Sequence, residues 1–261
     1  MQGSRIASVT GWQLTTQTYH HVKAKIFADC SGDGVLAPLT GADFRMGREA
    51  RSEFGEPIAP EKADERTMGM SLCFSARDTG TFQKFEPPAW AYRFEKDEDL
   101  PYGGRDSKWW KMGYWWIEVG GEHDAIHDAE SLRDELLKIA YGVWDHIKNR
   151  GRHGADNWVL QWMQFLLAKR ESRRFLGPHI LTQGDIEAEG RFDDLVAYGG
   201  WSMDDHHPAG FWAVKLGAPA TIFHPAPSPY GIPYRSLYSR NIANLFFAGR
   251  NISVTHAALS S

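Results

Sequence analysis

A short apolar run that stops in a glycine turn is the feature that most constrains how this chain can fold. Residues 25–34 read KIFADCSGDG, so a strand-like segment runs directly into a Gly-Asp-Gly turn. Residues 244–250 read NLFFAGR, so a second apolar segment also meets a glycine. Glycine has no Cβ, and backbone N–H groups at such a turn can lie against a phosphate or a ring edge. Either turn alone is also typical of an ordinary loop. Together they predict two parallel strands whose glycine turns lie side by side at one sheet edge.

The composition excludes several classes of partner. The 261 residues carry a formal net charge of −4, so no basic field draws the chain to nucleic acid or to an anionic membrane. No apolar run has the length that spans a membrane, and the first residues lack the apolar core of a signal peptide. Cys30 and Cys73 fit neither a C-x-x-C nor a zinc pattern. The compartment is therefore cytoplasmic only by default, and the oligomeric state is not predicted.

Hydrophobic periodicity predicts a chain of mixed α/β content. Segments rich in β-branched and aromatic residues predict short strands within residues 6–28, 67–75, 113–121, 173–182 and 192–200. Residues 128–149 predict an amphipathic helix, because apolar residues recur there at three- and four-residue spacing: Leu132, Leu136, Ile139, Val143 and Ile147. Further helices are predicted over 156–168, after Asp33, over 183–189 and after Ser253, which is the expected N-cap of the last one.

Several motifs follow one another in a fixed order. After FADCSGDG come RESRRFLGPHILTQGDI from Arg170, GGWSMDDHHP from Gly199, YGIPYRSL from Tyr230 and NLFFAGRNISVTHAALSS from Asn244. In this order the motifs resemble the FAD-dependent oxidoreductase family of the glutathione-reductase-like superfamily, over most of the chain. The resemblance implies FAD as cofactor and a Rossmann-type FAD-binding domain that is interrupted by a mixed-sheet substrate domain with helices. Residues 1–50 and 236–261 would then belong to the FAD-binding domain, and residues 51–235 to the inserted domain.

One family motif is missing from the sequence. The family's G-x-G-x-x-G turn, which holds the FAD pyrophosphate at a helix N-terminus, lies near the start of its chains. No G-x-G-x-x-G occurs here, and none of the residues before Ala28 supplies one. The expectation is therefore an interior fragment of a longer enzyme, one that also lacks the family's C-terminal end.

The resemblance assigns a set of cofactor contacts and two residues near the reaction. The cofactor contacts are Ser31, Gly32, Asp33, Gly34, Gly249, Arg250, Asn251 and Ser253. The catalytic candidates are His256, in the first turn of the last helix, and Arg174. That helix would aim its N-terminus at the flavin, where N–H groups stabilise the charge of the reduced ring and keep His256 neutral.

The run KRESRR, residues 169–174, supports two interpretations. It is either a solvated helix end or a strand entry that sends Arg173 and Arg174 to opposite faces, with one of them pointing into the site. Candidate substrate contacts are Arg173, His206, His207, Tyr234 and Arg235. A buried structural role is equally open for Tyr234.

No metal site is predicted from the sequence. Adjacent side chains in MDDHHP diverge on an extended chain, and no further ligand is placed by the sequence. The segment HDAIH at His123–His127 resembles H-E-x-x-H, but it has Asp in place of Glu and precedes the predicted helix.

The function that the resemblance implies is hydride transfer between a small organic substrate and flavin, with FAD supplying the redox chemistry. Another class of function stays open, because eleven tryptophans are present and many lie within 90–116 and 144–162. Such rings serve as stacking platforms in carbohydrate-binding modules, although packing in a core is their commoner role. A degenerate product without activity is the third alternative.

The missing pyrophosphate turn leads to a first prediction. The 261-residue chain by itself is expected not to hold FAD stoichiometrically. The pyrophosphate, the most charged part of the cofactor, would be contacted only by the turn that contains Arg250. After expression and desalting the protein should be colourless, poorly soluble and not stabilised by added FAD in a thermal melt. A yellow protein with about one flavin per chain would contradict this expectation.

Overall fold

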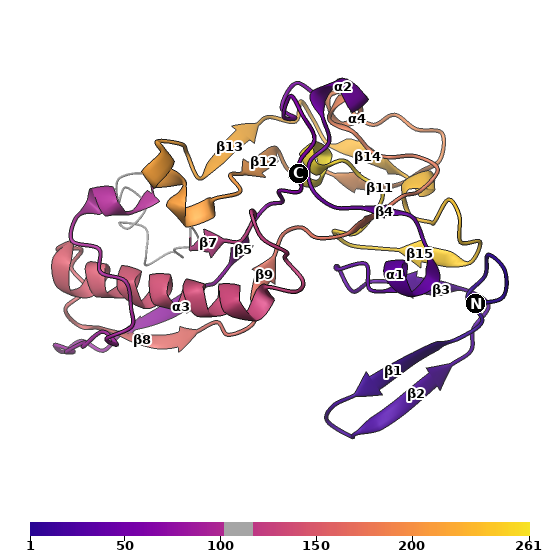
Figure 1. Cartoon of the computed structure of the whole chain (residues 1–261). Helices are drawn as coiled ribbons and strands as arrows, with labels where there is room; N and C mark the ends of the chain where they lie inside the picture. The colour runs from indigo at the N-terminus through magenta and orange to yellow at the C-terminus, as the bar shows by residue number, and fades with distance from the viewer. Residues whose placement is uncertain (102–116) are drawn as a thin grey trace. The chain divides into compact units, whose positions relative to one another are not determined.

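The computed structural model describes residues 1–101 and 117–261 (Figure 1). The chain divides into two compact units, and each unit is built from segments that are far apart in the sequence. Unit 1 consists of Met1–Glu65, Glu171–Met203 and His224–Ser261, and unit 2 of Arg66–Arg170 and Asp204–Phe223. Residues 171–203 and 224–235 thus pack with both ends of the chain. The division into 1–50, 51–235 and 236–261 stays a prediction about functional domains.

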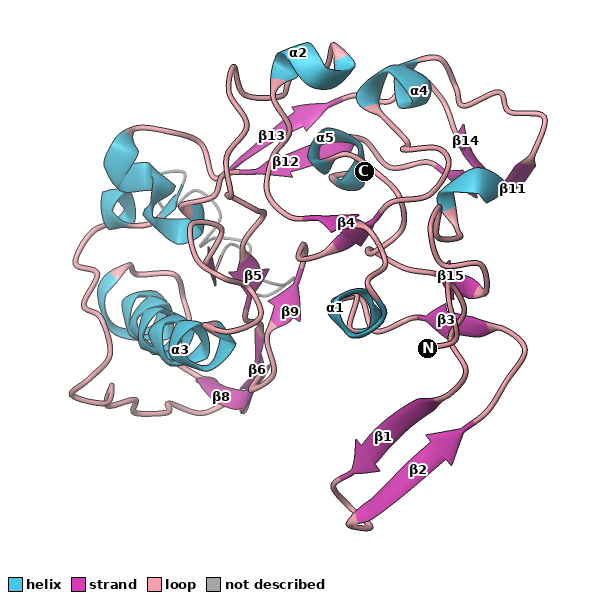
Figure 2. Cartoon of the chain, turned by 45° about the vertical axis from the view of Figure 1, so that its right-hand side comes forward, coloured by secondary structure: helices cyan, strands magenta, loops and turns pink. Residues whose placement is uncertain are grey.

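Unit 1 has mixed α/β content and small sheets. Its elements, in chain order, are β1 (Val9–Gln13), β2 (Thr18–Val22), β3 (Phe27–Asp29), α1 (Leu36–Thr40), β4 (Phe44–Arg45), α2 (Arg51–Phe54), β10 (Arg174–Phe175), α4 (Gln183–Glu187), β11 (Leu195–Gly199), β14 (Tyr230–Pro233), η5 (Tyr234–Ser236), β15 (Leu245–Phe247) and α5 (His256–Leu259). The antiparallel pairs are β1–β2, β4–β10 and β11–β14, and the parallel pair is β3–β15. Figure 2 shows β3 and β15 side by side.

Two apolar clusters hold unit 1 together. One surrounds the β3–β15 pair, where the rings of Phe175 and Phe247 stack with their centroids 4.7 Å apart. The other joins α4 to α5 and is made of Leu181, Ile186, Met203, Tyr230, Val254 and Ala258. The strand pair that carries both glycine turns is therefore anchored in a core.

Unit 2 is built around one long helix. Its elements are β5 (Met70–Ser71), β6 (Phe74–Asp78), η1 (Asp97–Asp99), β7 (Glu118–Val119), α3 (Ala129–Asp145), the π-helix η3 (His146–Arg150), β8 (Trp158–Met163), β9 (Ala168–Lys169) and η4 (Gly210–Leu216). Strand β5 lies between β7 and β9, and β6 pairs with β8, all antiparallel. Strands β12 (Met203–His206) and β13 (Thr221–His224) pair with each other and contain the boundaries between the units.

The predicted helix at 128–149 is confirmed as α3 together with η3. All five residues of the predicted stripe are buried, since Leu132, Leu136, Ile139, Val143 and Ile147 are at most 6% exposed. They form one core with the strands of the unit. Helical periodicity identified this helix because only one of its faces packs against the core, so apolar residues recur along that face alone.

The helix predicted over 156–168 is wrong, because this segment forms strands β8 and β9. Strand β8 pairs along its length with β6, from Trp158 opposite Asp78 to Met163 opposite Phe74. An apolar run of this length fits a buried strand and a helix equally well by periodicity. Pairing with β6, whose residues lie 80 to 89 positions earlier in the chain, makes this segment a strand rather than a helix.

Two predicted helix starts also differ from the structure. Thr255 rather than Ser253 caps α5, and its hydroxyl accepts from the backbone N–H of Ala258. Helix α1 begins at Leu36 rather than at Asp33, and the Leu36 N–H donates to Asp29 Oδ2 at 2.8 Å. In the predicted strand at 113–121, Glu118–Val119 is confirmed as β7, and residues 113–116 lie outside the described residues. No helix in residues 1–101 and 117–261 combines the length and apolarity needed to cross a membrane.

The tryptophans of unit 2 provide a test of this core. Trp144 is fully buried, whereas Trp162 on β8 is 52% exposed. Replacing Trp144 with Ala should lower the free energy of unfolding by about 3–5 kcal/mol, because a large cavity remains. Trp162→Ala is the matched control and should cost less than about 1 kcal/mol. Urea unfolding followed by circular dichroism measures both, and equal losses would contradict the burial described here.

Candidate functional site

The two predicted glycine turns do lie side by side in unit 1. Strand β3 pairs in parallel with β15, with Phe27 opposite Leu245 and Asp29 opposite Phe247, so both strands end at the same edge. The turn after β3 has two glycines with positive φ, and Gly249 after β15 has a φ of +96°. We call residues 31–34 and 249–251 the glycine edge. The predicted adjacency is confirmed, although these segments are more than 200 residues apart in the chain.

An ion pair closes the glycine edge. Asp33 Oδ1 accepts from Arg250 Nη2 and from Ser172 Oγ, each at 2.8 Å. Gly32 makes this contact possible, because a Cβ at position 32 would lie 2.7 Å from the Arg250 Cζ. Its φ of +73° also favours glycine. The positive φ is therefore the main reason for a glycine at position 32, since the Arg250 guanidinium could shift away from a Cβ.

Asp29, which the sequence analysis did not single out, organises the first turn. Its Oδ1 accepts from the backbone N–H and the hydroxyl of Ser31, at 2.9 and 2.6 Å. Its Oδ2 accepts from the N–H of Leu36 at the start of α1. From the second turn, Asn251 Nδ2 donates to the Asp29 carbonyl oxygen at 3.2 Å. The signal in the sequence is an acidic residue placed two positions before a Ser-Gly-Asp-Gly turn, where a carboxylate can accept from turn N–H groups.

Two buried polar atoms of the glycine edge have no hydrogen-bond partner among the described residues. They are Arg250 Nε, a donor, and Asn251 Oδ1, an acceptor. Buried polar groups are nearly always paired, so an unpaired donor and acceptor in neighbouring residues indicate a ligand position. A hydroxyl group can both donate and accept, so the donor and the acceptor together suit a ligand that carries hydroxyl groups.

Arg173 and Arg174 lie on opposite faces of the chain, as strand alternation predicts. Arg173 lies beside the glycine edge, where its Nη1 is 3.4 Å from the Asp33 carbonyl oxygen. Its Cβ would be 3.1 Å from a side chain at Gly34. Arg174 is buried completely. The predicted substrate contact at Arg173 thus belongs to the same locus as the predicted cofactor contacts.

The guanidinium of Arg174 is enclosed by protein groups. Its Nη1 lies 3.0 Å from Glu49 Oε1 and 3.0 Å from the Val254 carbonyl oxygen, and its Nη2 donates to the carbonyl oxygen of Gly47. Its Nε is 3.2 Å from Glu171 Oε1. Burial by itself raises the pKa of Glu49, but the charge and hydrogen bonds of Arg174 and the His256 N–H outweigh burial, so the pKa is lowered. Glu49 is therefore ionised at neutral pH.

His256 is held by the same network. Its backbone N–H donates to Glu49 Oε2 at 2.9 Å, and its Nδ1 lies 2.8 Å from Glu171 Oε2. An ionised carboxylate only accepts, so Nδ1 carries the proton, and in the neutral ring Nε2 is the basic nitrogen. The arrangement orients the imidazole in the way expected for a residue that accepts or returns a proton.

The start of α5 is occupied by side chains of unit 1. Thr255 donates its hydroxyl to Glu56 Oε1 at 2.6 Å, and burial raises the pKa of Glu56 despite this hydrogen bond. Ser253, a predicted cofactor contact, is fully buried and donates to the His179 carbonyl oxygen at 2.6 Å. These contacts fix the backbone from Ser253 to His256.

The remaining predicted substrate residues are divided between the two units. His206 is buried in unit 2, and the neighbouring His207 accepts at Nδ1 from the N–H of Ala209. In unit 1, Arg235 forms a two-pronged ion pair with Asp194 at 3.0 and 3.1 Å. Tyr234 is 44% exposed. Their roles in substrate binding stay predictions.

His206 is the centre of a second buried charge cluster. Its Nδ1 lies 2.8 Å from Glu118 Oε2 and its Nε2 lies 3.3 Å from Asp204 Oδ2. Arg170 joins the cluster, with Nη2 3.3 Å from Glu118 and Nη1 2.5 Å from Ser71 Oγ. Burial lowers the pKa of His206, as does the Arg170 charge, but the hydrogen bonds with Asp204 and Glu118 prevail, and the pKa is raised.

Glycine turns at the carboxyl ends of adjacent parallel strands are typical of dinucleotide-binding proteins. The chain matches the family model of FAD dependent oxidoreductases over residues 1–261 and belongs to this family, whose cofactor is FAD. The family predicted from the motifs is thereby confirmed. Searches of curated proteins and of solved structures found no match.

The His206 cluster generates a prediction about pH. The pKa of His206 is raised in the folded state. The charged imidazole therefore stabilises the fold fully below the pKa of His206 in the unfolded chain, which is about 6.5. The stabilisation is lost as the pH rises through the higher folded-state pKa. The unfolding free energy of the wild type should therefore exceed that of His206→Asn most at low pH, with a difference that shrinks above about pH 6.5. Urea titrations between pH 5.5 and 9 measure it, and a constant difference would contradict the charged His206.

Proposed function

We propose that the chain is part of a flavoenzyme with a Rossmann-type FAD-binding fold. This enzyme would transfer a hydride between a small organic substrate and FAD. The observation that supports this most strongly is the glycine edge, because parallel pairing brings two distant glycine turns to one place. Bound FAD would supply the redox chemistry, by accepting or donating the hydride. Ser31, Gly32, Asp33, Gly34, Gly249, Arg250, Asn251 and Ser253 stay the proposed cofactor residues.

The charge distribution suggests which part of FAD the glycine edge would hold. Asp33 is an anion beside Arg250, so the edge presents a nearly neutral pair rather than an unopposed cation. A pyrophosphate would meet the Asp33 carboxylate, whereas a ribose or ribityl hydroxyl can donate to it. Arg250 Nε and Asn251 Oδ1 would complete the hydrogen bonds. We therefore assign the hydroxyl-bearing part of FAD to this edge.

His256 is the proposed proton-transfer residue. Glu171 holds the proton on Nδ1, so Nε2 would take the hydroxyl or amine proton of the substrate when its hydride departs. Arg174 is better described as a positioning residue, because it contacts Glu49 and Glu171 and is fully buried. The proposed substrate contacts stay as predicted from the sequence: Arg173, His206, His207, Tyr234 and Arg235.

Two variants separate cofactor binding from chemistry in the FAD-loaded holoenzyme, with any residues that flank this chain in its gene retained. Arg250→Gln removes a charge-assisted hydrogen bond worth about 1.5–3 kcal/mol, so the Kd for FAD should rise roughly 10- to 100-fold. His256→Ala should leave the Kd for FAD nearly unchanged and slow flavin reduction about 10²- to 10⁴-fold. Equilibrium dialysis gives the Kd, and stopped-flow absorbance gives the reduction rate.

Arg240→Gln is the matched control, because Arg240 forms a comparable ion pair with Asp43 at 2.7 Å and is half exposed. It should change neither quantity. If Arg250→Gln retains FAD as well as this control does, the glycine edge does not hold the cofactor. Flavin reduction at the wild-type rate in His256→Ala would remove His256 from the chemistry.

A further inference from the structure

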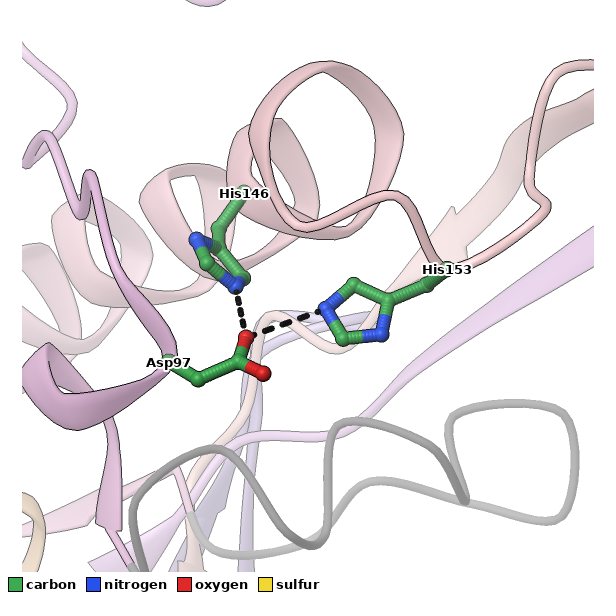
Figure 3. A group of neighbouring side chains, drawn as sticks. All are labelled: Asp97, His146 and His153. Carbon is green, nitrogen blue, oxygen red and sulfur yellow. Dashed lines mark hydrogen bonds and ion pairs between the residues drawn. The ribbon is translucent and has the colours of Figure 1, made fainter.

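Unit 2 contains a group of metal-binding side chains to which the proposed function assigns no role. Asp97 in η1, His146 at the start of η3 and His153 in the following loop point toward one another (Figure 3). Their ligand atoms all lie within 4.8 Å of one another. Asp97 Oδ1 is 2.7 Å from His146 Nε2 and 3.4 Å from His153 Nε2. One carboxylate and two imidazoles thus converge on a single point.

The backbone fixes which nitrogen of His146 faces Asp97. His146 Nδ1 lies 3.0 Å from the Phe94 carbonyl oxygen, which only accepts, so Nδ1 carries a proton. In the neutral ring, Nε2 would then present its lone pair to a carboxylate oxygen at 2.7 Å. Such a contact needs a cation between the two atoms, and this cation is either a proton or a metal ion. A histidine whose far nitrogen donates to a carbonyl is also the usual arrangement of a metal ligand.

Local backbone geometry makes room for the two rings. Gly151 lies between the histidines in the chain, and a Cβ there would be 2.1 Å from His153 Nε2 and 2.6 Å from His146 Nε2. The next residue, Arg152, has a φ of +53°, which is unfavourable for a non-glycine residue. His146 itself begins a π-helical turn. π-Turns and strained residues of this kind are frequent at functional sites.

Burial divides the group in two. The side chain of His146 is 1% exposed and that of His153 is 5% exposed, whereas Asp97 is 37% exposed. The imidazoles are therefore shielded from water, and the carboxylate gives an ion access from solvent. The cation Arg150 is paired with Asp145 and Glu95, at 2.7 and 3.1 Å.

We propose that Asp97, His146 and His153 bind one divalent transition-metal ion of the Zn²⁺ class. Tetrahedral Zn²⁺ places its ligands about 3.3 Å apart, so the contacts of 2.7 and 3.4 Å need only a small adjustment. Nitrogen and carboxylate ligands suit Zn²⁺ and Co²⁺ rather than Ca²⁺ or Mg²⁺. Three protein ligands leave at least one position for water or an added ligand.

The test is calorimetric titration of the full chain with ZnCl₂. One equivalent of Zn²⁺ should bind with a Kd of about 1 μM or tighter. His153→Gln and Asp97→Asn should each weaken binding at least roughly 100-fold. Co²⁺ should give a visible d–d spectrum in the wild type that is lost in both variants.

The double variant His123→Gln/His127→Gln is the matched control. Its histidines are 61% and 73% exposed and lie next to carboxylates, so they form the rival site for adventitious zinc. Zinc binding should be unchanged in this variant. The proposal is overturned if no tight binding occurs, if binding survives in His153→Gln or Asp97→Asn, or if the control abolishes it. Thermal melts without metal identify a misfolded variant, and the other single variant then carries the test.

Discussion

A guanidinium without access to water governs the arrangement of unit 1. Arg174 is fully buried, and an unpaired buried charge would cost several kcal/mol. Its partners come from three separate parts of the chain: Gly47 and Glu49, Glu171, and Val254. Each of these segments must therefore be in place before the charge is satisfied. The network then fixes His256, because Glu49 binds its N–H and Glu171 binds its ring.

The same strand connects this network to the glycine edge. Arg173 lies beside the Gly-Asp-Gly turn and Arg174 is buried in the core, because successive side chains on an extended chain point to opposite faces. Ser172 adds a hydrogen bond to Asp33. A short run of polar residues, 171–174, thus links the proposed cofactor residues to the proposed proton-transfer residue. Displacement of this run would change both regions together, which explains why so many polar residues are buried here.

Local pattern predicted what depends on local structure. The apolar stripe from Leu132 to Ile147 spans about four turns of α3 and η3, so its period alone identified a helix with a buried face. The divergence of Arg173 and Arg174 followed from strand geometry. Strand geometry did not predict which of the two side chains is buried, because the burial of Arg174 depends on Glu49, 125 positions away. Residues 156–168 were misassigned for the same reason, since their pairing with β6 is a long-range property. Thr255 is the cap in place of Ser253 because α5 begins only at His256, and Ser253 instead donates to the His179 carbonyl oxygen.

The two histidine groups of unit 2 show where sequence spacing carries information and where it carries none. His123 and His127 have the spacing of neighbours on a helix, but α3 begins only at Ala129, and each ring turns to a nearby aspartate. Spacing implies a shared face only within a continuous regular element. Asp97, His146 and His153 have no recognisable spacing, since 49 positions separate the first two. The end of α3, the π-turn and Gly151 bring them together. A ligand set of this kind depends on tertiary structure, and only the folded chain reveals it.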